Sequence, residues 1–246
     1  MTRAFARRLL AEFLGTALLV AAVVGSGIAA ATLSPHDAGL QLLENSLATA
    51  LALAVLILMF GSVSGAHFNP VVTAADWLLR RGTDTGPSTK DVGGYVVAQT
   101  LGAIAGASLA NSMYALAPVS WSTKDRSAPH LWLGEIVATA GLIALVFTLT
   151  RTGRTALAPL SVGAYIGAAF WFTSSTSFAN PAVTIGRAFT DTFTGIAPAS
   201  VPGFVAAQLI GAGVGLAVVL ALVPGPATRP DPPAGLLSSP RQPAAG

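Results

Sequence analysis

The stretch that decides the fold is Ser177-Phe178-Ala179-Asn180-Pro181-Ala182-Val183-Thr184-Ile185-Gly186-Arg187, which has an earlier counterpart in Ser64-Gly65-Ala66-His67-Phe68-Asn69-Pro70-Val71-Val72-Thr73. Each copy places small or polar residues and a phenylalanine before an Asn-Pro pair and a short apolar run. Asparagine is a preferred N-cap residue and proline suits the first helical turn, so each copy predicts the start of a helix. Because each follows a long apolar segment, the sequence predicts two helices that begin inside or beside a membrane.

The composition is that of an integral membrane protein. Of the 246 residues, 53% are hydrophobic and only 9% are charged, against about 25% charged residues in soluble domains. The absence of cysteine excludes disulfides, thiol catalysis and cysteine metal sites. His36, His67 and His130 are too scattered to suggest a zinc site, so we expect no metal and no cofactor. A net charge of +3 without a basic stripe interleaved with aromatic residues argues against nucleic-acid binding.

Six segments are long enough to cross a hydrocarbon core, which takes roughly 20 apolar residues in a helix. The first follows a basic N-terminus, as in a signal peptide, but its length and the internal Glu12 favour a retained span. The six predicted spans cover residues 9–31, 42–62, 92–116, 131–150, 156–174 and 201–223.

The Asn-Pro pairs lie between these spans, in residues 63–81 and 175–198, whose apolar pieces are too short to cross a bilayer. Irregular backbone within a membrane is tolerated only where protein or a water-filled cavity supplies hydrogen bonds. We therefore expect two re-entrant half-helices that enter the protein rather than the lipid. The predicted fold class is an all-α membrane protein with six transmembrane helices and two re-entrant half-helices.

Lysine and arginine are distributed unevenly between the connections. By the positive-inside rule, the more basic side faces the cytoplasm. We therefore expect a multi-pass protein of the inner or plasma membrane with both termini cytoplasmic, residues 1–8 forming the N-terminus and residues 224–246 a disordered tail. Six spans place Arg3, Arg7, Arg8, Arg80, Arg81, Lys90, Arg151, Arg154, Arg229 and Arg241 on one side, and Lys124 and Arg126 on the other.

The predicted channel region, residues 9–223, contains an internal repeat. Its halves, about residues 9–116 and 131–223, each hold an odd number of spans, so the second half is inserted upside down. Inverted repeats of this kind place a shared site near the middle of the bilayer. Closely spaced glycines in residues 102–106 and 211–215 predict helices that pack closely. The matching pairs are Glu12 with Glu135, Asn69 with Asn180, and Gln99 with Gln208.

Two half-helices entering from opposite faces bring their N-termini together, each with about half a positive charge. A cation is repelled at that point, whereas a neutral molecule is not. Asn69 and Asn180 either act only as caps or also offer amide N–H donors to a lumen, and water oriented by such donors cannot relay protons easily. The pore-lining interpretation is favoured by the duplication. We predict a pore centre formed by Asn69, Pro70, Val71, Asn180, Pro181 and Ala182.

On these motifs, and on the two matched acids and two matched glutamines, residues 8–223 resemble the major intrinsic protein family, the aquaporins and aquaglyceroporins. The resemblance implies an aquaporin-like inverted repeat, one pore per subunit and a homotetramer in the lipid bilayer. It also implies that Glu12 and Glu135 hydrogen-bond the backbone of the re-entrant loops, with a proton relay as the alternative role. His67, Gln99 and Gln208 are expected to support the pore.

The resemblance also implies a second, extracellular constriction made by four positions. Family members usually have arginine directly after the second motif, where this chain has Val183. Counting without gaps from the two motifs assigns the other positions to Thr49, Ala168 and Ser177, and a shift of one residue from Ala168 exposes another small residue. With neither an aromatic ring nor a guanidinium, this filter is expected to be wide and weakly polar.

Arg187 lies four residues after Val183, about one helical turn along the same face. It either restores positive charge below the constriction or packs against a loop or a neighbouring subunit. We favour packing, because an arginine one turn deeper would partly fill the lumen.

A filter lacking arginine and rings resembles that of bacterial family members associated with arsenic resistance. Arsenous acid is uncharged in neutral solution, and its hydroxyls resemble those of a small polyol. We predict a passive channel for small uncharged solutes, with trivalent or methylated arsenicals favoured and glycerol and water following. One alternative is a channel mainly for water or glycerol. Another is a non-conducting structural protein, which the small filter residues disfavour.

An enzyme is not expected. Serine and threonine are plentiful, but no histidine or cysteine is placed to activate one of them, and His67 adjoins a motif better explained by pore lining. We therefore predict no catalytic residues.

Overall fold

The structure, a computed structural model, describes residues 2–83 and 86–224, and this part of the chain holds helices and loops without strands. Six of its helical segments are long and apolar enough to cross a membrane, which confirms the predicted fold class. The long α-helices are α1 (Arg3–Leu33), α2 (Ala38–Ser64), α4 (Thr89–Met113), α5 (Pro129–Arg151), α6 (Ala158–Phe172) and α8 (Val201–Leu222).

The observed helices extend beyond the predicted apolar spans at several ends. α1 already begins at Arg3, because the hydroxyl of Thr2 caps it by accepting a hydrogen bond of 3.3 Å from the Phe5 amide. Short 3-10 turns precede two of the long helices, η1 (Thr155–Leu157) before α6 and η2 (Pro198–Ser200) before α8. The prediction of a disordered tail concerns residues 224–246, of which 225–246 lie outside the described part.

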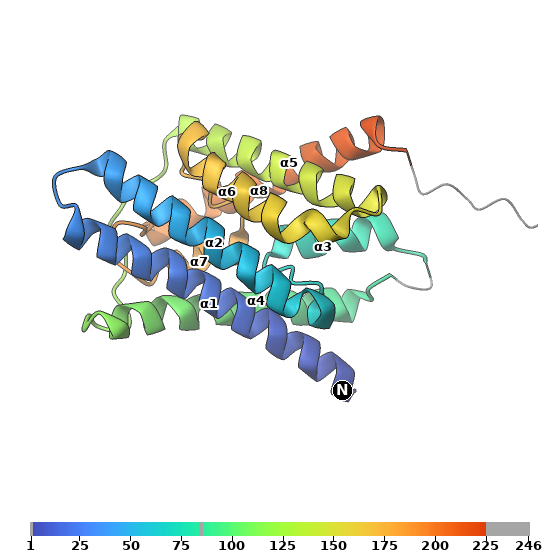
Figure 1. Cartoon of the computed structure of the whole chain (residues 1–246), viewed down its shortest axis with the longest axis horizontal. Helices are drawn as coiled ribbons and strands as arrows, with labels where there is room; N and C mark the ends of the chain where they lie inside the picture. Colours follow the sequence, from blue (N-terminus) through green and yellow to red (C-terminus); the bar gives the residue numbers. More distant parts are fainter. Residues whose placement is uncertain (1, 84–85, 225–246) are drawn as a thin grey trace, which may run out of the picture.

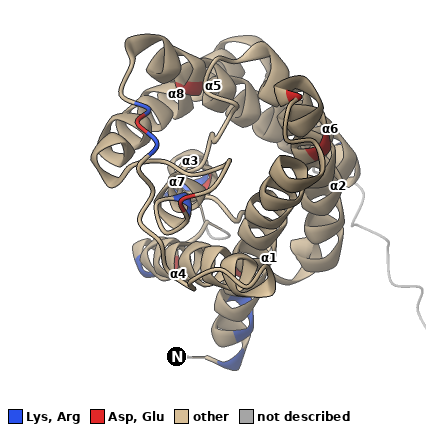
Figure 2. Ribbon diagram, turned by 90° about the vertical axis from the view of Figure 1, so that its left-hand side faces the viewer, with Lys and Arg blue, Asp and Glu red and all other residues tan. Residues whose placement is uncertain are grey.

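Two short helices occupy the interior of the bundle. They are α3 (Pro70–Arg80) and α7 (Pro181–Arg187), each starting at proline with asparagine as its N-cap. Viewed from one end, both lie inside the ring formed by the six long helices (Figure 2). Both helix starts therefore agree with the predicted positions, although α7 has 7 residues where α3 has 11.

Corresponding helix pairs of the two repeats pack closely through glycine. A Cβ atom on Gly102 of α4 would collide with the carbonyl oxygen of Phe13 in α1, and one on Gly211 of α8 with that of Ile136 in α5. The absence of a side chain therefore lets each pair of backbones come into direct contact. These pairs, α1 with α4 and α5 with α8, form two walls of the ring.

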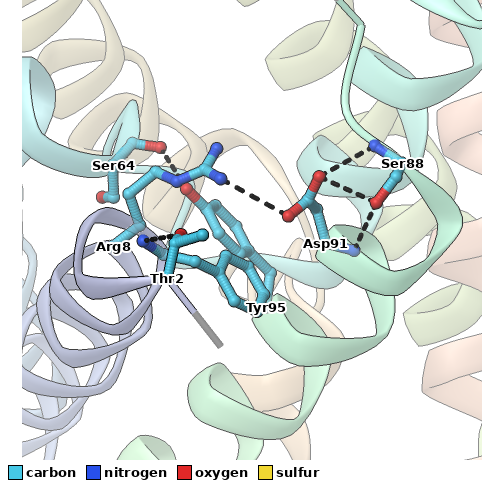
Figure 3. Close-up of polar contacts among 7 residues, drawn as sticks. Thr2, Arg8, Ser64, Ser88, Asp91 and Tyr95 are labelled. Carbon is cyan, nitrogen blue, oxygen red and sulfur yellow. Dashed lines mark hydrogen bonds and ion pairs between the residues drawn. The ribbon is translucent and has the colours of Figure 1, made fainter.

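The end of the bundle that holds the N-terminus is tied together by polar contacts (Figures 1 and 3). Arg8 of α1 forms a 3.4 Å ion pair with Asp91 of α4, and Asp91 also closes a capping box with Ser88. The hydroxyl of Tyr95 donates a 2.8 Å hydrogen bond to the carbonyl of Ser64, the last residue of α2. The Tyr95 bond thus ties α4 to the end of α2, where the first re-entrant loop begins.

Candidate functional site

The two re-entrant loops share an unusual backbone. Ala66 and Phe68 in the first loop, and Ser177 and Ala179 at the matching positions of the second, have φ between 48° and 50°. Residues other than glycine rarely adopt this left-handed conformation, which costs roughly 1–2 kcal/mol per residue. Four such residues at equivalent positions require strong compensating interactions.

The buried carboxylate of Glu12 supplies them to the first loop. Its Oε1 accepts hydrogen bonds from the hydroxyl of Ser64 (2.6 Å) and the amide of His67 (3.0 Å), and its Oε2 accepts from the amide of Phe68 (2.7 Å). The side chain of Gln99 donates a further bond of 2.8 Å to Oε2. All four contacts are donated to this carboxylate, so Glu12 acts here as an acceptor that shapes the loop backbone.

Glu135 does the same for the second loop. Its two oxygens accept the amides of Phe178 and Ala179, both at 2.8 Å, and Gln208 donates to it at 2.6 Å. Gln208 also donates to Thr184 at 2.9 Å, just as Gln99 donates to Thr73 at 3.0 Å in the other repeat. The two glutamates and two glutamines, which the sequence predicts to support a pore, thus lie at equivalent positions beside the loops.

The two asparagines lie at the meeting point of the half-helices. The side-chain oxygen of Asn69 caps α3 by accepting the Val71 amide at 3.1 Å, and that of Asn180 caps α7 by accepting the Ala182 amide at 3.0 Å. Each side-chain nitrogen donates to a carbonyl of the opposite loop, Asn69 to Ala179 and Asn180 to Phe68, both at 2.8 Å. One N–H of each asparagine amide therefore links the two re-entrant loops, and the second N–H remains available to the cavity.

A cavity of about 550 Å³ passes this centre. Both asparagines line it, and its walls extend from Thr155 near the N-terminal end to Thr49 and Arg187 near the other end. Most of the lining side chains are aliphatic or aromatic. His67 lines it too, with its Nδ1 3.1 Å from the hydroxyl of Thr73. The cavity thus has an apolar wall with few polar positions, the arrangement typical of small-molecule sites.

Three of the four predicted filter residues, Thr49, Ser177 and Val183, line this cavity, and each is at most 5% exposed. Ala168 does not line it, because that side of α6 faces outward and the residue is exposed. Phe170 occupies the cavity wall instead. Ala168 is therefore not a cavity-lining residue in this structure, and the expectation of a filter without an aromatic ring stays a prediction.

A sequence signal for Phe170 did exist. Val162, Ile166 and Phe170 recur every four residues along α6, and all three line the cavity. This helical spacing marks the inward face of α6 more directly than a count across the following loop does.

Arg187 lines the cavity as well, and it is 2% exposed. α7 runs from the pore centre toward the connection between α4 and α5, since the carbonyl of Ala188 accepts a bond from the Ser122 amide. Arg187 therefore lies farther from the centre than Val183, not deeper as the sequence suggested. Its Nε also donates to the carbonyl of Thr194, so the side chain both packs against a loop and faces the lumen.

Comparison with known proteins agrees with this geometry. The sequence profile described as Major intrinsic protein matches residues 1–179. The chain belongs to the major intrinsic protein family. This major intrinsic protein is 51% identical over 213 residues to aquaglyceroporin AqpS of Rhizobium meliloti (strain 1021), covering 87% of the chain and 88% of that relative. It is 33% identical over 225 residues to the glycerol uptake facilitator protein of Pseudomonas aeruginosa, covering 79% and 77%.

Among solved structures, the aquaglyceroporin from Plasmodium falciparum has the same fold, with a TM-score of 0.65 over 89% of this chain and 97% of that one. The sequence identity is 22%, so this likeness concerns the fold. The family and the named relatives are channels rather than enzymes, which confirms the predicted class of protein.

Proposed function

We propose that this major intrinsic protein is a passive channel for small uncharged solutes, with trivalent or methylated arsenicals favoured and glycerol and water also carried. The observation that carries the proposal is the apolar-walled cavity that passes Asn69 and Asn180. Through a path of this shape, solutes move down their own gradients.

Charge selection at the centre supports uncharged solutes. The caps of α3 and α7 meet there, and their helix dipoles each place about half a positive charge beside the lumen. The free amide hydrogens of Asn69 and Asn180 add donors in the same place. A cation loses hydration water there without gaining an acceptor, whereas a hydroxyl oxygen gains a donor.

The residue after the second motif supports solutes larger than water. Val183 lines the cavity where family members usually have arginine, and it leaves this part of the wall apolar. The most similar relative named above is described as an aquaglyceroporin. Arsenous acid offers hydroxyls on a compact neutral core, as glycerol does, so both fit a wall of this kind.

A channel mainly for water or glycerol is the second candidate, and Phe170 is the observation that favours it. An aromatic ring in the wall narrows the path and offers a face for the carbon backbone of a polyol. The ranking of arsenicals against glycerol therefore depends on the room left between Phe170 and Val183.

We further propose a homotetramer in the inner or plasma membrane with both termini cytoplasmic. Large apolar side chains such as Leu51, Leu58 and Leu220 are exposed on the outer faces of the helices, where lipid or other subunits would cover them. Among the described residues, the N-terminal end carries more lysine and arginine than the end with Lys124 and Arg126.

The test is stopped-flow light scattering on proteoliposomes with water, glycerol and urea, together with uptake of arsenous and methylarsonous acid. Thr49→Trp should block every flux, because Thr49 lines the cavity and is 3% exposed. Leu51→Trp is the matched control on the same helix, since Leu51 is 60% exposed and should tolerate the ring.

Arsenical uptake at the level of empty vesicles, alongside rapid glycerol or water flux, would refute the arsenical preference and leave the second candidate. No flux of any solute from a correctly folded protein would support the non-conducting structural role instead.

A further inference from the structure

Three successive backbone carbonyls near one end of the cavity each hold a cationic side chain. The carbonyl of Phe193 accepts a 2.7 Å bond from Lys124, that of Thr194 accepts one from Arg187, and that of Gly195 accepts a 3.0 Å bond from Arg126. The segment 193–195 therefore gathers three positive charges, of which only Arg187 lines the cavity.

The ring of Phe178 is the second support for this cluster. The guanidinium carbon of Arg187 lies 3.4 Å from the ring centroid, and that of Arg126 lies 5.0 Å from it. A cation over an aromatic face is stabilised by the ring quadrupole, most strongly where water is excluded. Phe178 is 4% exposed, and its own amide is held by Glu135, so the ring has a fixed position.

No carboxylate among the described residues forms an ion pair with Arg187; the ion pairs found there are Arg8 with Asp91 and Arg80 with Asp76. Within the same residues, its terminal nitrogens have no hydrogen-bond acceptor, since only Nε is bonded. A buried charge in this situation is costly unless something else solvates it. The contents of the cavity are the remaining source of acceptors.

Two hydroxyl groups on the same cavity are also unpartnered. Thr49 Oγ1 and Ser177 Oγ are buried and have no hydrogen-bond partner among the described residues. Both residues are 3% exposed and line the cavity that Arg187 lines. Both oxygens have almost no accessible surface, so each would need a small rotation of its side chain to reach a partner in the cavity.

The neighbouring cations reinforce the positive potential, which the carboxylate of Glu135 partly offsets at both arginines. Burial lowers the pKa of Arg126 to about 10, which leaves it charged in neutral solution. The nearby acids Asp125 and Asp191 accept hydrogen bonds from Ser127 and Thr123, and they form no ion pair with the cluster within the described residues.

We propose that Arg187 supplies the charge of the filter from one helical turn beyond Val183, held by Phe178 and the Thr194 carbonyl, and that this charge excludes cations while Val183 leaves room for larger neutral solutes. The inference deepens the proposed channel function and rests on it. It separates two tasks that one arginine at position 183 would perform together, namely repelling cations and narrowing the path.

The test compares variants of the full-length protein in proteoliposomes, using sodium and proton leak alongside glycerol permeability. Arg187→Gln keeps a donor for the Thr194 carbonyl but removes the charge, whereas Arg187→Lys keeps the charge. We expect cation leak to rise by about tenfold or more in the glutamine variant, because a nearby unit charge in a site of low dielectric acts strongly. Leak should stay within about twofold of the parent in the lysine variant. The control Arg81→Met removes a charge at an exposed site near the other end of the bundle, and it should change neither cation leak nor glycerol permeability.

The double variant Val183→Arg with Arg187→Gln moves the charge to position 183, where family members usually have arginine. It should restore low cation leak and reduce glycerol permeability, because the side chain at 183 now fills part of the lumen. Equal leak in the parent and in Arg187→Gln, or equal leak in the glutamine and lysine variants, would overturn the inference. Either result alongside normal glycerol flux would leave the proposed channel function intact, whereas loss of all flux in the parent would reject that function.

Discussion

The side-chain amide of Asn69 donates a 2.8 Å hydrogen bond to the carbonyl oxygen of Ala179, the residue directly before Asn180. Asn180 returns the contact to Phe68, the residue directly before Asn69. Each half-helix cap is therefore fixed by the loop of the other repeat. The orientation of both amides, and so the positive character of the pore centre, depends on this exchange.

Replacing Asn180 with aspartate should make the centre permeable to cations. The carboxylate of Asn180→Asp cannot donate to the Phe68 carbonyl, and its negative charge offsets the dipoles of the two half-helices. We expect sodium or proton leak to rise by about tenfold, measured with a pH-sensitive dye in vesicles under an imposed potential. Asn111→Asp is the matched control, because Asn111 is equally buried but holds loop carbonyls away from the cavity. A leak equal in both variants would count against the role assigned to the central amides.

Neutralising Glu12 should destabilise the first loop. In Glu12→Gln, one oxygen is replaced by an NH₂ group that faces donors such as the Phe68 amide. Leaving that buried amide without an acceptor costs about 1–3 kcal/mol and removes support for two left-handed residues. We expect a lower unfolding temperature in detergent together with reduced glycerol flux. Glu44→Gln, at the start of α2, should leave both unchanged, and an equal loss in the two variants would contradict the specific role.

Adding a methyl group at the helix contact should separate α5 from α8. Gly211→Ala would drive a Cβ into the carbonyl of Ile136, and overpacking of this kind costs about 1–3 kcal/mol. Gly213→Ala, on the same helix, meets nothing within 4 Å and should be neutral or stabilise by up to about 1 kcal/mol. Thermal unfolding of the two purified variants in one detergent gives the comparison. Similar unfolding temperatures for the two variants would show that α5 and α8 can move apart to accommodate the methyl group at little cost.

Exchanging the residues of α6 distinguishes its inner from its outer face. Phe170→Ala removes a ring from the cavity wall and should admit longer polyols, such as a four-carbon alditol, at a rate at least severalfold higher. Ala168→Phe adds a ring on the exposed face and should leave the solute range unchanged. The measurement is stopped-flow swelling with polyols of increasing length. A narrowed solute range in Ala168→Phe would restore the assignment made from the sequence.

Much of the architecture could be predicted because it is encoded locally. An apolar segment of sufficient length needs a helix to satisfy its backbone in lipid, and the Asn-Pro pairs mark helix starts through capping and a fixed φ. The repetition of Glu12 and Gln99 as Glu135 and Gln208 indicated which elements correspond. For these features the sequence contains both the position and the physical reason.

The wall opposite the half-helices was harder to predict. Which face of α6 points inward depends on the length and path of the loop between Phe172 and Asn180, where three residues take left-handed φ values. A count across that loop assumes a standard path, and it led to Ala168, which lies off the cavity wall. For Arg187 the sequence favoured packing against a loop but could not name the acceptor, because Thr194 belongs to an irregular connection with no periodic pattern.

The hydrogen bond from Asn69 to Ala179 also orders events along the growing chain. Glu12 finds all its described donors within the first repeat, so that loop can acquire its shape early. The acceptor for Asn69, however, is made 110 residues later. Until then, the side-chain amide of Asn69 lacks this acceptor. The first half-helix is therefore shaped within its own repeat but oriented by the second, so a chain interrupted before residue 179 would hold a formed loop with an unfixed central amide.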